Sequence, residues 1–202
     1  GFYSDVLGAT ACKSCDAGKI STTKGTSDCV RCSVGKYVAS SGSTTCSLCA
    51  PGKYSASNGS TTCVLCSAGK FSTTEGNKVE SDCVLCSVGT YSAISGSTIC
   101  MQCVQGKFSS TEGNDAETDC ELCPRGKFSP ETAAFACQTC SAGTYSTTQG
   151  NIHSSSCIPC PAGKYSTSPG AISNSTCIDC AVGKYSNAIG NNAEAHCILC
   201  DE

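Results

Sequence analysis

The chain has 202 residues, with 22 cysteines, 21 glycines, no tryptophan and a formal net charge of −3 at pH 7. This acidic balance, without any basic cluster, argues against nucleic-acid binding, and no apolar run has the length of a membrane span. Aromatic residues make up only 6% of the chain, so apolar burial is expected to be too small to offset the entropy of ordering the backbone. Cysteine at this density is typical of scaffolds held by disulfides in an oxidising compartment.

One short pattern recurs eleven times and accounts for nearly every cysteine, glycine and aromatic residue. It reads C-x-x-G-K-[Y/F]-S-x-x-x-x-G-x-x-x-C-x-x-C, and the stretch 49–66 is a clear example. The first cysteines of successive C-x-x-C pairs are 17 or 20 residues apart, and the three extra residues always follow the second glycine. The unit to explain is therefore one repeat, and the chain is an array of such repeats.

We expect one continuous array of repeats without an internal domain boundary, because no linker or block of charge interrupts it. The predicted repeats are 1–17, 18–34, 35–51, 52–68, 69–88, 89–105, 106–125, 126–142, 143–162, 163–182 and 183–202. Joining residue 202 to residue 1 would restore a short repeat. This indicates either a window cut from a longer array or a chain that docks head to tail with copies of itself.

Each repeat is predicted to form a small hairpin. In the G-K-Y-S run, alternation places the aromatic side chain on one face of a short strand and the Lys and Ser side chains on the other. The second glycine, preceded by polar residues, predicts a turn. The expected buried side chains are the aromatic and the aliphatics inside C-x-x-C, such as Val64 and Leu65 or Ile198 and Leu199. No stretch has the 3.6-residue periodicity of a helix.

The C-x-x-C motif occurs in three kinds of site: zinc sites, redox-active pairs and structural disulfides. Two pairs about 15–20 residues apart can close a tetrahedral zinc site, but eleven pairs cannot all combine two at a time, and no histidine recurs in the unit. A thioredoxin-like redox pair needs a βαβ frame and a single poised motif, and neither is present. Structural disulfides are therefore favoured, and no metal or cofactor is expected.

Two disulfide schemes remain open. In the favoured one, a ladder, the second cysteine of one pair bonds the first cysteine of the next, and each bond closes a loop worth ~3 kcal/mol in the chain-entropy model. The ladder predicts the bonds Cys15–Cys29, Cys32–Cys46, Cys49–Cys63, Cys66–Cys83, Cys86–Cys100, Cys103–Cys120, Cys123–Cys137, Cys140–Cys157, Cys160–Cys177 and Cys180–Cys197. It leaves Cys12 and Cys200 for bonds to a neighbouring repeat or molecule. The alternative bonds like to like, and a Cys15 to Cys32 link would rule out the ladder.

The run C-A-P-G-K-Y-S-x(7)-C-V-L-C resembles the first module of tumour necrosis factor receptor cysteine-rich domains. It is more similar still to the ephrin-receptor-type cysteine-rich repeats found in tandem in many extracellular proteins, and the resemblance covers all eleven units. In the receptor module the corresponding two cysteines are joined around the aromatic, which supports the ladder. The larger second module of the receptor family is missing, which weakens any transfer of ligand binding. The resemblance implies an extracellular setting, an elongated shape and no catalytic residues.

The predicted fold class is therefore small, disulfide-rich β. We expect an elongated, solenoid-like rod of eleven hairpin units, each of 17 or 20 residues, stapled by a ladder of disulfides.

Two N-glycosylation sequons are candidate modification sites, at Asn58 and Asn174. Asn58 precedes a glycine and could instead be only a turn residue, and Asn174 could be polar filler in an inserted segment. Because both segments are expected to be exposed and exported, we expect both asparagines to carry glycan. The many Ser and Thr residues leave O-linked sugar open.

No other residues indicate a catalytic or metal-binding site. His153 and His196 are the only histidines, and isolated exposed histidines rarely bind metal. A loose group of carboxylates could be considered for calcium, although nothing resembles an EF-hand loop; it comprises Glu75, Glu80, Asp82, Glu112, Asp115, Glu117 and Asp119. No phosphate loop, nucleophile motif or paired acid site is found, so the chain is not expected to be an enzyme.

Two functions follow from these features. The first is a structural extracellular protein, a rod-like and glycosylated subunit of a surface filament or fibre whose main partner is itself, head to tail or laterally. The second is the ectodomain of a cell-surface receptor or adhesion protein that binds a protein or sugar through its variable loops. For the second, the irregular segment from Pro124 to Cys137, with Arg125, Pro130 and Phe135 and without the second glycine, is the best candidate site.

Overall fold

The structure of the protein is a computed structural model that describes residues 1–201. In this part of the chain, eleven two-stranded sheets follow one another, and each is formed by the two strands of a single repeat. In one of them Lys53 lies opposite Leu65 and Tyr54 opposite Val64, in antiparallel register. Together with ten disulfides in a ladder, these hairpins confirm the small disulfide-rich β fold.

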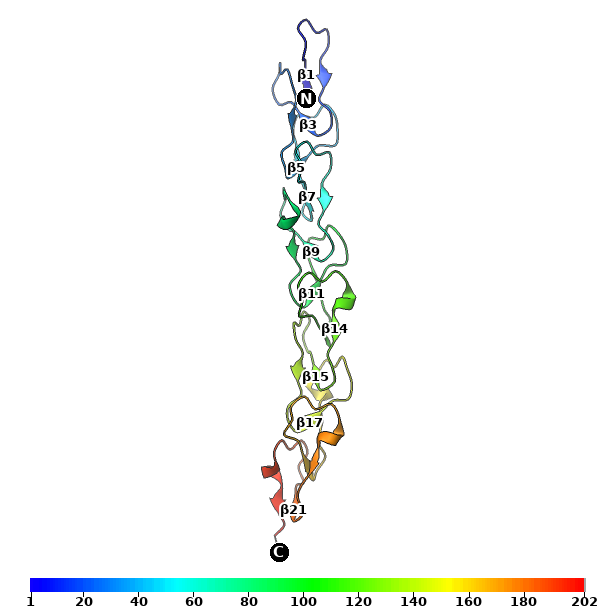
Figure 1. Ribbon diagram of the computed structural model, residues 1–202, viewed down its shortest axis with the longest axis vertical. Helices are drawn as coiled ribbons and strands as arrows, with labels where there is room; N and C mark the ends of the chain where they lie inside the picture. Colours follow the sequence, from blue (N-terminus) through cyan, green and yellow to red (C-terminus); the bar gives the residue numbers. More distant parts are fainter. Residues whose placement is uncertain (202) are drawn as a thin grey trace. The chain divides into compact units, whose positions relative to one another are not determined.

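The strands have two residues each and form two sets (Figure 1). The first strands carry the aromatic slot and are β1 (Phe2–Tyr3), β3 (Lys19–Ile20), β5 (Lys36–Tyr37), β7 (Lys53–Tyr54), β9 (Lys70–Phe71), β11 (Thr90–Tyr91), β13 (Lys107–Phe108), β15 (Lys127–Phe128), β17 (Thr144–Tyr145), β19 (Lys164–Tyr165) and β21 (Lys184–Tyr185). The second strands lie between the two cysteines of a pair and are β2 (Lys13–Ser14), β4 (Val30–Arg31), β6 (Ser47–Leu48), β8 (Val64–Leu65), β10 (Val84–Leu85), β12 (Met101–Gln102), β14 (Glu121–Leu122), β16 (Gln138–Thr139), β18 (Ile158–Pro159), β20 (Ile178–Asp179) and β22 (Ile198–Leu199).

The repeat of residues 52–68 shows why these residues form a hairpin. A β-turn precedes the first strand, with the Lys53 amide donating to the Ala50 carbonyl at 3.1 Å. Gly52, at the third position of this turn, has φ 75°, a conformation that other residues rarely adopt. Just after the second strand, the amide of Cys66 donates to the carbonyl of Gly52, which precedes the first strand, at 2.8 Å. The two chain segments are thus joined at the base of the hairpin.

The three-residue insertions of the long repeats form single 3₁₀ turns just before the first cysteine. They are η1 (Glu80–Asp82), η2 (Glu117–Asp119), η3 (Ser154–Ser156), η4 (Asn174–Thr176) and η5 (Glu194–His196). In η1 the Asp82 carboxylate accepts hydrogen bonds from the amides of Lys78, at 2.7 Å, and Val79, at 3.2 Å. The insertion therefore satisfies its own backbone and leaves the hairpin unchanged.

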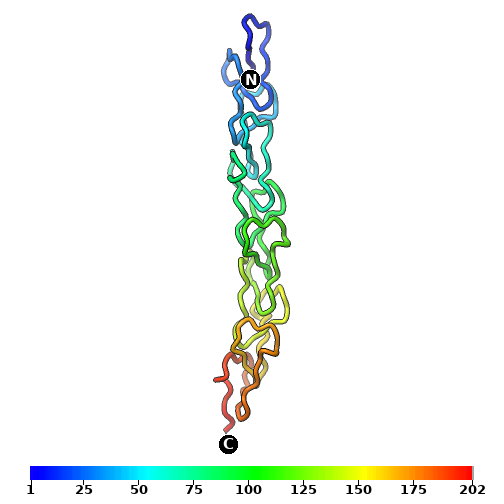
Figure 2. The backbone as a smooth tube through the Cα atoms, in the orientation of Figure 1, coloured from blue at the N-terminus to red at the C-terminus, as the bar shows by residue number. Residues whose placement is uncertain are grey.

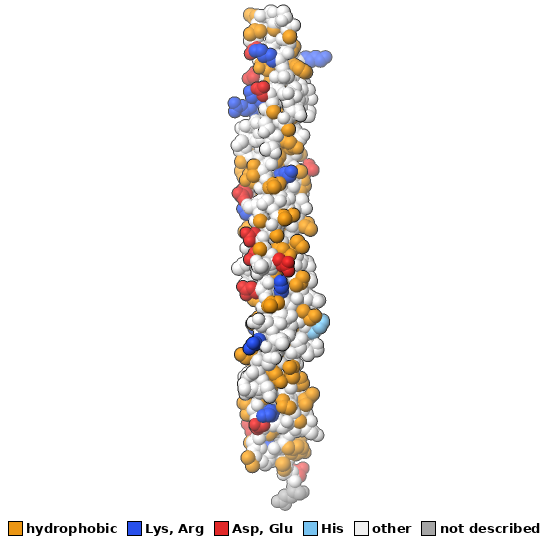
Figure 3. Space-filling view, turned by 90° about the vertical axis from the view of Figure 1, so that its right-hand side faces the viewer, with side chains coloured by type: hydrophobic (Ala, Val, Ile, Leu, Met, Phe, Trp, Pro, Cys, Tyr) orange, Lys and Arg blue, Asp and Glu red, His pale blue; other side chains and the backbone are white. Residues whose placement is uncertain are grey.

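The buried side chains are mainly disulfide cysteines, serines and asparagines, with a few apolar ones such as Tyr91 and Phe128. The aliphatics expected to be buried inside C-x-x-C are exposed instead: Val64 is 54% and Leu65 46% exposed, and Ile198 and Leu199 are exposed to a similar degree. A two-stranded sheet without a second layer covers neither face of these residues, and apolar side chains are spread over the surface seen in Figure 3.

The serine after the aromatic was predicted to lie on the strand face opposite the aromatic, and it was not among the side chains expected to be buried. Ser55 is only 2% exposed, and the serines of the same slot from Ser21 to Ser186 are buried as well. The strand has only two residues, so its alternation does not reach the serine. The aromatic side chains vary, from buried Tyr91 and Phe128 to exposed Tyr185.

The chain divides into two compact units that interleave in sequence. The first consists of Gly1–Cys86, Tyr91–Met101 and Gly113–Ala116, and the second of Ser87–Thr90, Gln102–Glu112 and the chain from Glu117 onward. Within each unit the repeats follow one another in chain order (Figure 2). The division of the sequence into eleven repeats at the boundaries given above stays a prediction.

Candidate functional site

The most regular feature of the structure is the contact between consecutive repeats. The amide of Gly52 donates to the carbonyl of Ser72 in the next repeat at 2.9 Å, and the amide of Ser55 donates to the carbonyl of Asn77 at 3.0 Å. The same two bonds recur along the chain, for example from Gly143 to Ser166 and from Ser146 to Ala171. Consecutive hairpins are therefore joined by backbone groups, which any sequence with the right turns can supply.

A second contact reaches two repeats away. The amide of Gly76 donates to the carbonyl of Cys49 at 2.8 Å. In the same layer, a Cβ atom built on Gly35 would lie 2.3 Å from the carbonyl oxygen of Gly76. The first glycine of a repeat cannot be replaced without strain, for two reasons. Its φ is positive, and a carbonyl group from two repeats further on lies where a Cβ atom would be.

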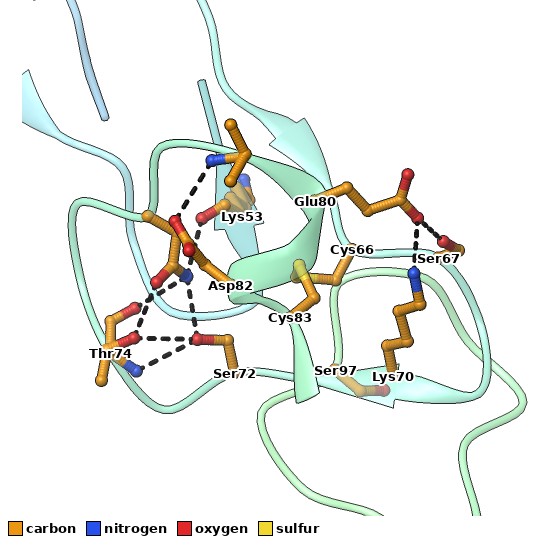
Figure 4. The surroundings of a disulfide bond; sticks show 12 residues. Lys53, Cys66, Ser67, Lys70, Ser72, Thr74, Glu80, Asp82, Cys83 and Ser97 are labelled. Atoms are coloured by element: carbon orange, nitrogen blue, oxygen red, sulfur yellow. Dashed lines mark hydrogen bonds and ion pairs between the residues drawn. A yellow bond between two sulfur atoms is a disulfide. The ribbon is translucent and has the colours of Figure 1, made fainter. Parts of the chain in front are cut away.

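A buried asparagine fastens most long repeats to the preceding one, and sequence reasoning missed it. The Nδ2 group of Asn77 donates to the Lys53 carbonyl at 3.2 Å and to the Ser72 hydroxyl at 2.8 Å. Its Oδ1 accepts from the Thr74 hydroxyl at 2.7 Å. Figure 4 shows the side chains of Ser72 and Thr74 pointing toward one another, and their hydroxyl groups are 3.0 Å apart. Asparagine follows the second glycine in four of the five long repeats, and that spacing was the available signal.

The disulfide ladder supplies the covalent links between repeats. All ten predicted pairs are bonded, with Cα–Cα distances from 5.5 to 5.8 Å. Among residues 1–201, Cys12 and Cys200 are the free cysteines, and both are exposed. Their predicted bonds to a neighbouring repeat or molecule stay a prediction.

The irregular repeat keeps the backbone of its neighbours without their glycine. Ala133 adopts φ 57°, a positive value shared along residues 1–201 only with glycines. Its amide donates to the Cys103 carbonyl at 2.8 Å, as the second glycine does elsewhere. A surface hollow of about 450 Å³ lies along this loop, from Ser129 to Gln138, and includes Phe135, which is 66% exposed.

The two sequon asparagines, Asn58 and Asn174, both lie at the surface. The side-chain oxygen of Asn58 accepts from the Val34 amide at 3.2 Å, and Asn174 begins η4. Glycan attachment at either asparagine stays a prediction.

The residues considered for metal binding are dispersed. His153 and His196 are exposed. Carboxylates in the long repeats pair with lysines, as Glu80 does with Lys70 at 3.2 Å and Glu194 with Lys184 at 2.9 Å. Figure 4 shows Glu80 between Lys70 and Ser67. Within the described chain, no group of three or more possible ligands is arranged around one point.

Tandem hairpins with disulfides between consecutive repeats define a class, the extracellular cysteine-rich repeat proteins. The family described as tyrosine-protein kinase ephrin type A/B receptor-like matches residues 18–61, 35–83 and 132–177. These matches cover more than half of the sequence, and the chain belongs to this family. No curated protein was found to match the sequence.

Membership in the family bears on the setting of this chain. Its modules are of an extracellular, non-catalytic type, which agrees with the disulfide content. In addition, no helix among residues 1–201 is both long enough and apolar enough to cross a bilayer.

Proposed function

We propose that this chain is a structural extracellular protein, secreted or held at the cell surface, whose repeats form part of a surface filament or fibre. The observation that carries the proposal is the uniform coupling of each hairpin to the next two. Because the coupling uses backbone groups, glycines and disulfides, an array of this kind lengthens by adding units without any change in the unit itself.

Three further features support this proposal. The contacts that hold the repeats together do not depend on a large apolar core, so surface side chains remain free to vary. The aliphatics on the exposed strands, such as Val64 and Val84, provide surface for lateral association. The two exposed sequons provide attachment points for glycan at Asn58 and Asn174.

Electron microscopy of the native material, labelled with an antibody against the chain, tests the filament. We expect labelled fibrils with a regular axial repeat. Labelled particles that are short and uniform in size would contradict the proposal. Intact mass before and after glycosidase treatment gives the state of the two sequons independently of the filament.

A second function, a receptor or adhesion ectodomain, is supported by one specific observation. The hollow beside Phe135 places an exposed aromatic ring next to the polar side chains of Glu131, Thr132 and Gln138. A flat ring with polar neighbours suits a sugar or a peptide, and the receptor in the family description points in the same direction.

Binding of the labelled chain to immobilised glycans and to intact cells tests this second function. Loss of binding in a Phe135→Ala variant, with retention in Ile99→Ala, would favour the receptor, because Ile99 is similarly exposed in another repeat. No binding above that of an unrelated disulfide-rich protein would leave the filament as the better explanation.

A further inference from the structure

A surface hollow of about 440 Å³ lies between two consecutive repeats, 18–34 and 35–51, and two cationic side chains line it. These are Arg31 and Lys36, and the two cysteines of the Cys32–Cys46 disulfide also form part of its wall. The volume is within the range of about 300–1,000 Å³ that is usual for ligand sites. The hollow is therefore large enough for more than a single small ion.

Neither cation is neutralised by the protein. Arg31 and Lys36 are exposed, and neither forms an ion pair within residues 1–201. The sequence contains no carboxylate side chain between residues 29 and 74. Asp28, just before this stretch, accepts a hydrogen bond from the amide of the next residue at 2.7 Å. An anion in the hollow would therefore meet two positive charges that have no other partner.

Packing holds the stem of Arg31 in place. A Cβ atom built on Gly59 would lie 3.4 Å from Cδ of Arg31 and 3.6 Å from its Cβ, so this stem lies along the turn at Gly59. Lys19 lies directly opposite Arg31 in the hairpin and adds a third positive charge nearby. A guanidinium with a packed stem loses less conformational freedom when it binds a ligand.

Hydroxyl groups line the same hollow. They belong to Thr22, Ser33, Thr44 and Thr45. None of the four has a hydrogen-bond partner within the described part of the chain. A hydroxyl group both donates and accepts hydrogen bonds. These side chains can therefore bind the hydroxyl groups of a ligand as well as its anionic oxygens.

The corresponding hollow between two other repeats has no charge. It is lined by Thr139 and Thr144, and its volume is about 260 Å³. By position in the repeat, Thr139 corresponds to Arg31 and Thr144 to Lys36. The positive charge is therefore a property of one pair of repeats and not of the repeat pattern.

The difference in volume also has a cause in the sequence. Ile20 lines the larger hollow, and Phe128 lines the smaller one at the same position of the repeat. Ile20 is the only residue in the aromatic slot that is not aromatic. The smaller side chain leaves space where ten other repeats carry a ring.

We propose that this hollow binds an oxyanion group, a sulfate ester or a carboxylate, of an acidic extracellular polysaccharide. Arg31 suits two oxygens of such a group side by side, Lys36 adds a second charged contact, and the hydroxyl groups bind those of the sugar. A sugar fits better than an inorganic anion, because the hollow is many times larger than the roughly 30 Å³ of a water molecule. The family type is extracellular, and the site depends neither on the filament nor on the hollow beside Phe135.

Titration of the 202-residue chain with a fluorescent heparin oligosaccharide and with a hyaluronan oligosaccharide tests the site. We expect saturable binding of at least one of them. Binding of hyaluronan would assign the carboxylate as sufficient, and binding of heparin alone would assign the sulfate ester. Binding of neither would overturn the proposal, as would equally tight binding of a single-stranded oligonucleotide of the same charge or full displacement by equimolar inorganic sulfate.

Two double variants separate the site from general attraction by charge. Arg31→Gln with Lys36→Gln should weaken binding at least about tenfold, because it removes both charged contacts. Lys53→Gln with Lys127→Gln removes the same charge from two lysines that are also exposed, and binding should stay within about twofold. Equal losses in the two variants would contradict a site in this hollow.

A change of shape without a change of charge gives a second test. Ile20→Tyr places in the slot the ring that other repeats have, so it should fill part of the hollow and weaken binding about tenfold. Ile20→Val keeps the space open and should leave binding within about twofold. Denaturation midpoints establish that all four variants fold. Unchanged binding in a folded Ile20→Tyr variant would overturn the proposal.

Discussion

The carbonyl oxygen of Gly59 lies so close to Gly18, two repeats earlier, that a Cβ atom built on Gly18 would be 2.1 Å from it. Real Cβ atoms do not approach an oxygen this closely, so the first glycine of a repeat is a packing residue as well as a turn residue. This relationship recurs from Gly35 and Gly76 to Gly143 and Gly190. It sets how closely the hairpins stack.

Gly126→Ala is expected to destabilise the protein by about 2–4 kcal/mol, because it adds left-handed strain and a steric conflict. The added Cβ atom would lie 2.2 Å from the carbonyl oxygen of Gly170. Gly183→Ala is the matched control, since Gly183 has φ 85° but an open surrounding, and it should cost only about 1 kcal/mol. Denaturant unfolding with intact disulfides measures both. Equal losses would show that conformation alone, and not the close approach, requires glycine.

Ala133→Gly is expected to stabilise the irregular repeat by roughly 0.5–1 kcal/mol. Ala133 is held at φ 57°, where an alanine is strained and a glycine is not, although glycine also raises the entropy of the unfolded chain. Ala134→Gly, one residue further on, is the control and should destabilise, because it brings only the entropic cost. Destabilisation by Ala133→Gly, measured by the same denaturant unfolding, would contradict this account of the loop.

Asn77→Ala should cost about 1–3 kcal/mol, because it leaves the Lys53 carbonyl and the Ser72 hydroxyl without the buried amide that they bind. Asn77→Ser should cost less, since three of the six short repeats have serine in this slot, namely Ser43, Ser60 and Ser97. In one of them the Ser92 hydroxyl donates to the Ser97 hydroxyl at 2.7 Å. Hydrogen exchange should show faster opening at the Ser55 amide, which donates to the carbonyl of residue 77. Unchanged exchange in both variants would mean that the side chain does not fasten the repeats.

Removing one internal disulfide by the double change Cys49→Ala and Cys63→Ala should cost about 3 kcal/mol in the chain-entropy model. Cys12→Ala, which removes an exposed free thiol, should change stability by no more than about 0.5 kcal/mol. Hydrogen exchange read by mass spectrometry should place the first variant's loss of protection in residues 50–62 and their neighbours. A loss spread evenly over the chain would indicate that the whole array unfolds as one cooperative unit.

Lowering the pH is expected to weaken the hydrogen bonds that the carboxylates of η1 accept. The hydroxyl of Ser67 and the ammonium of Lys70 hold the pKa of Glu80 below its ordinary 4.5, and the amides of Lys78 and Val79 hold the pKa of Asp82 below 3.8. Both groups therefore stabilise the fold above these ordinary values, and the stabilisation is lost as pH falls through the lowered pKa values of the folded state.

Titration of the carboxyl carbons by NMR measures these shifts directly. In a Ser67→Ala variant the pKa of Glu80 should rise towards 4.5, while Asp82, which has different partners, should be unaffected. A pKa of Glu80 at or above 4.5 in the unaltered protein would contradict the assigned hydrogen bonds. Because both carboxylates are exposed, the effect on overall stability is expected to be small.

The sequence predicted the hairpin and the ladder because both depend on local spacing. Cysteines at a fixed period limit the possible loops, and the C-x-x-G turn gives each strand a fixed start, as at Gly52. The interior could not be predicted in the same way. Val64 and Leu65 have the composition of core residues, yet two-residue strands without a second layer leave them exposed, whereas Ser55 is buried because the next repeat covers it.

By itself, therefore, the sequence determined the repeat, its turns and its covalent links, because these are set by residues within one period. The tertiary structure alone decided that each hairpin also contacts the repeat two positions away, and that Asn77 fastens one repeat to another. Such contacts join residues of different repeats. A repeated sequence pattern shows that the units have the same local structure, but it does not determine how one unit packs on another.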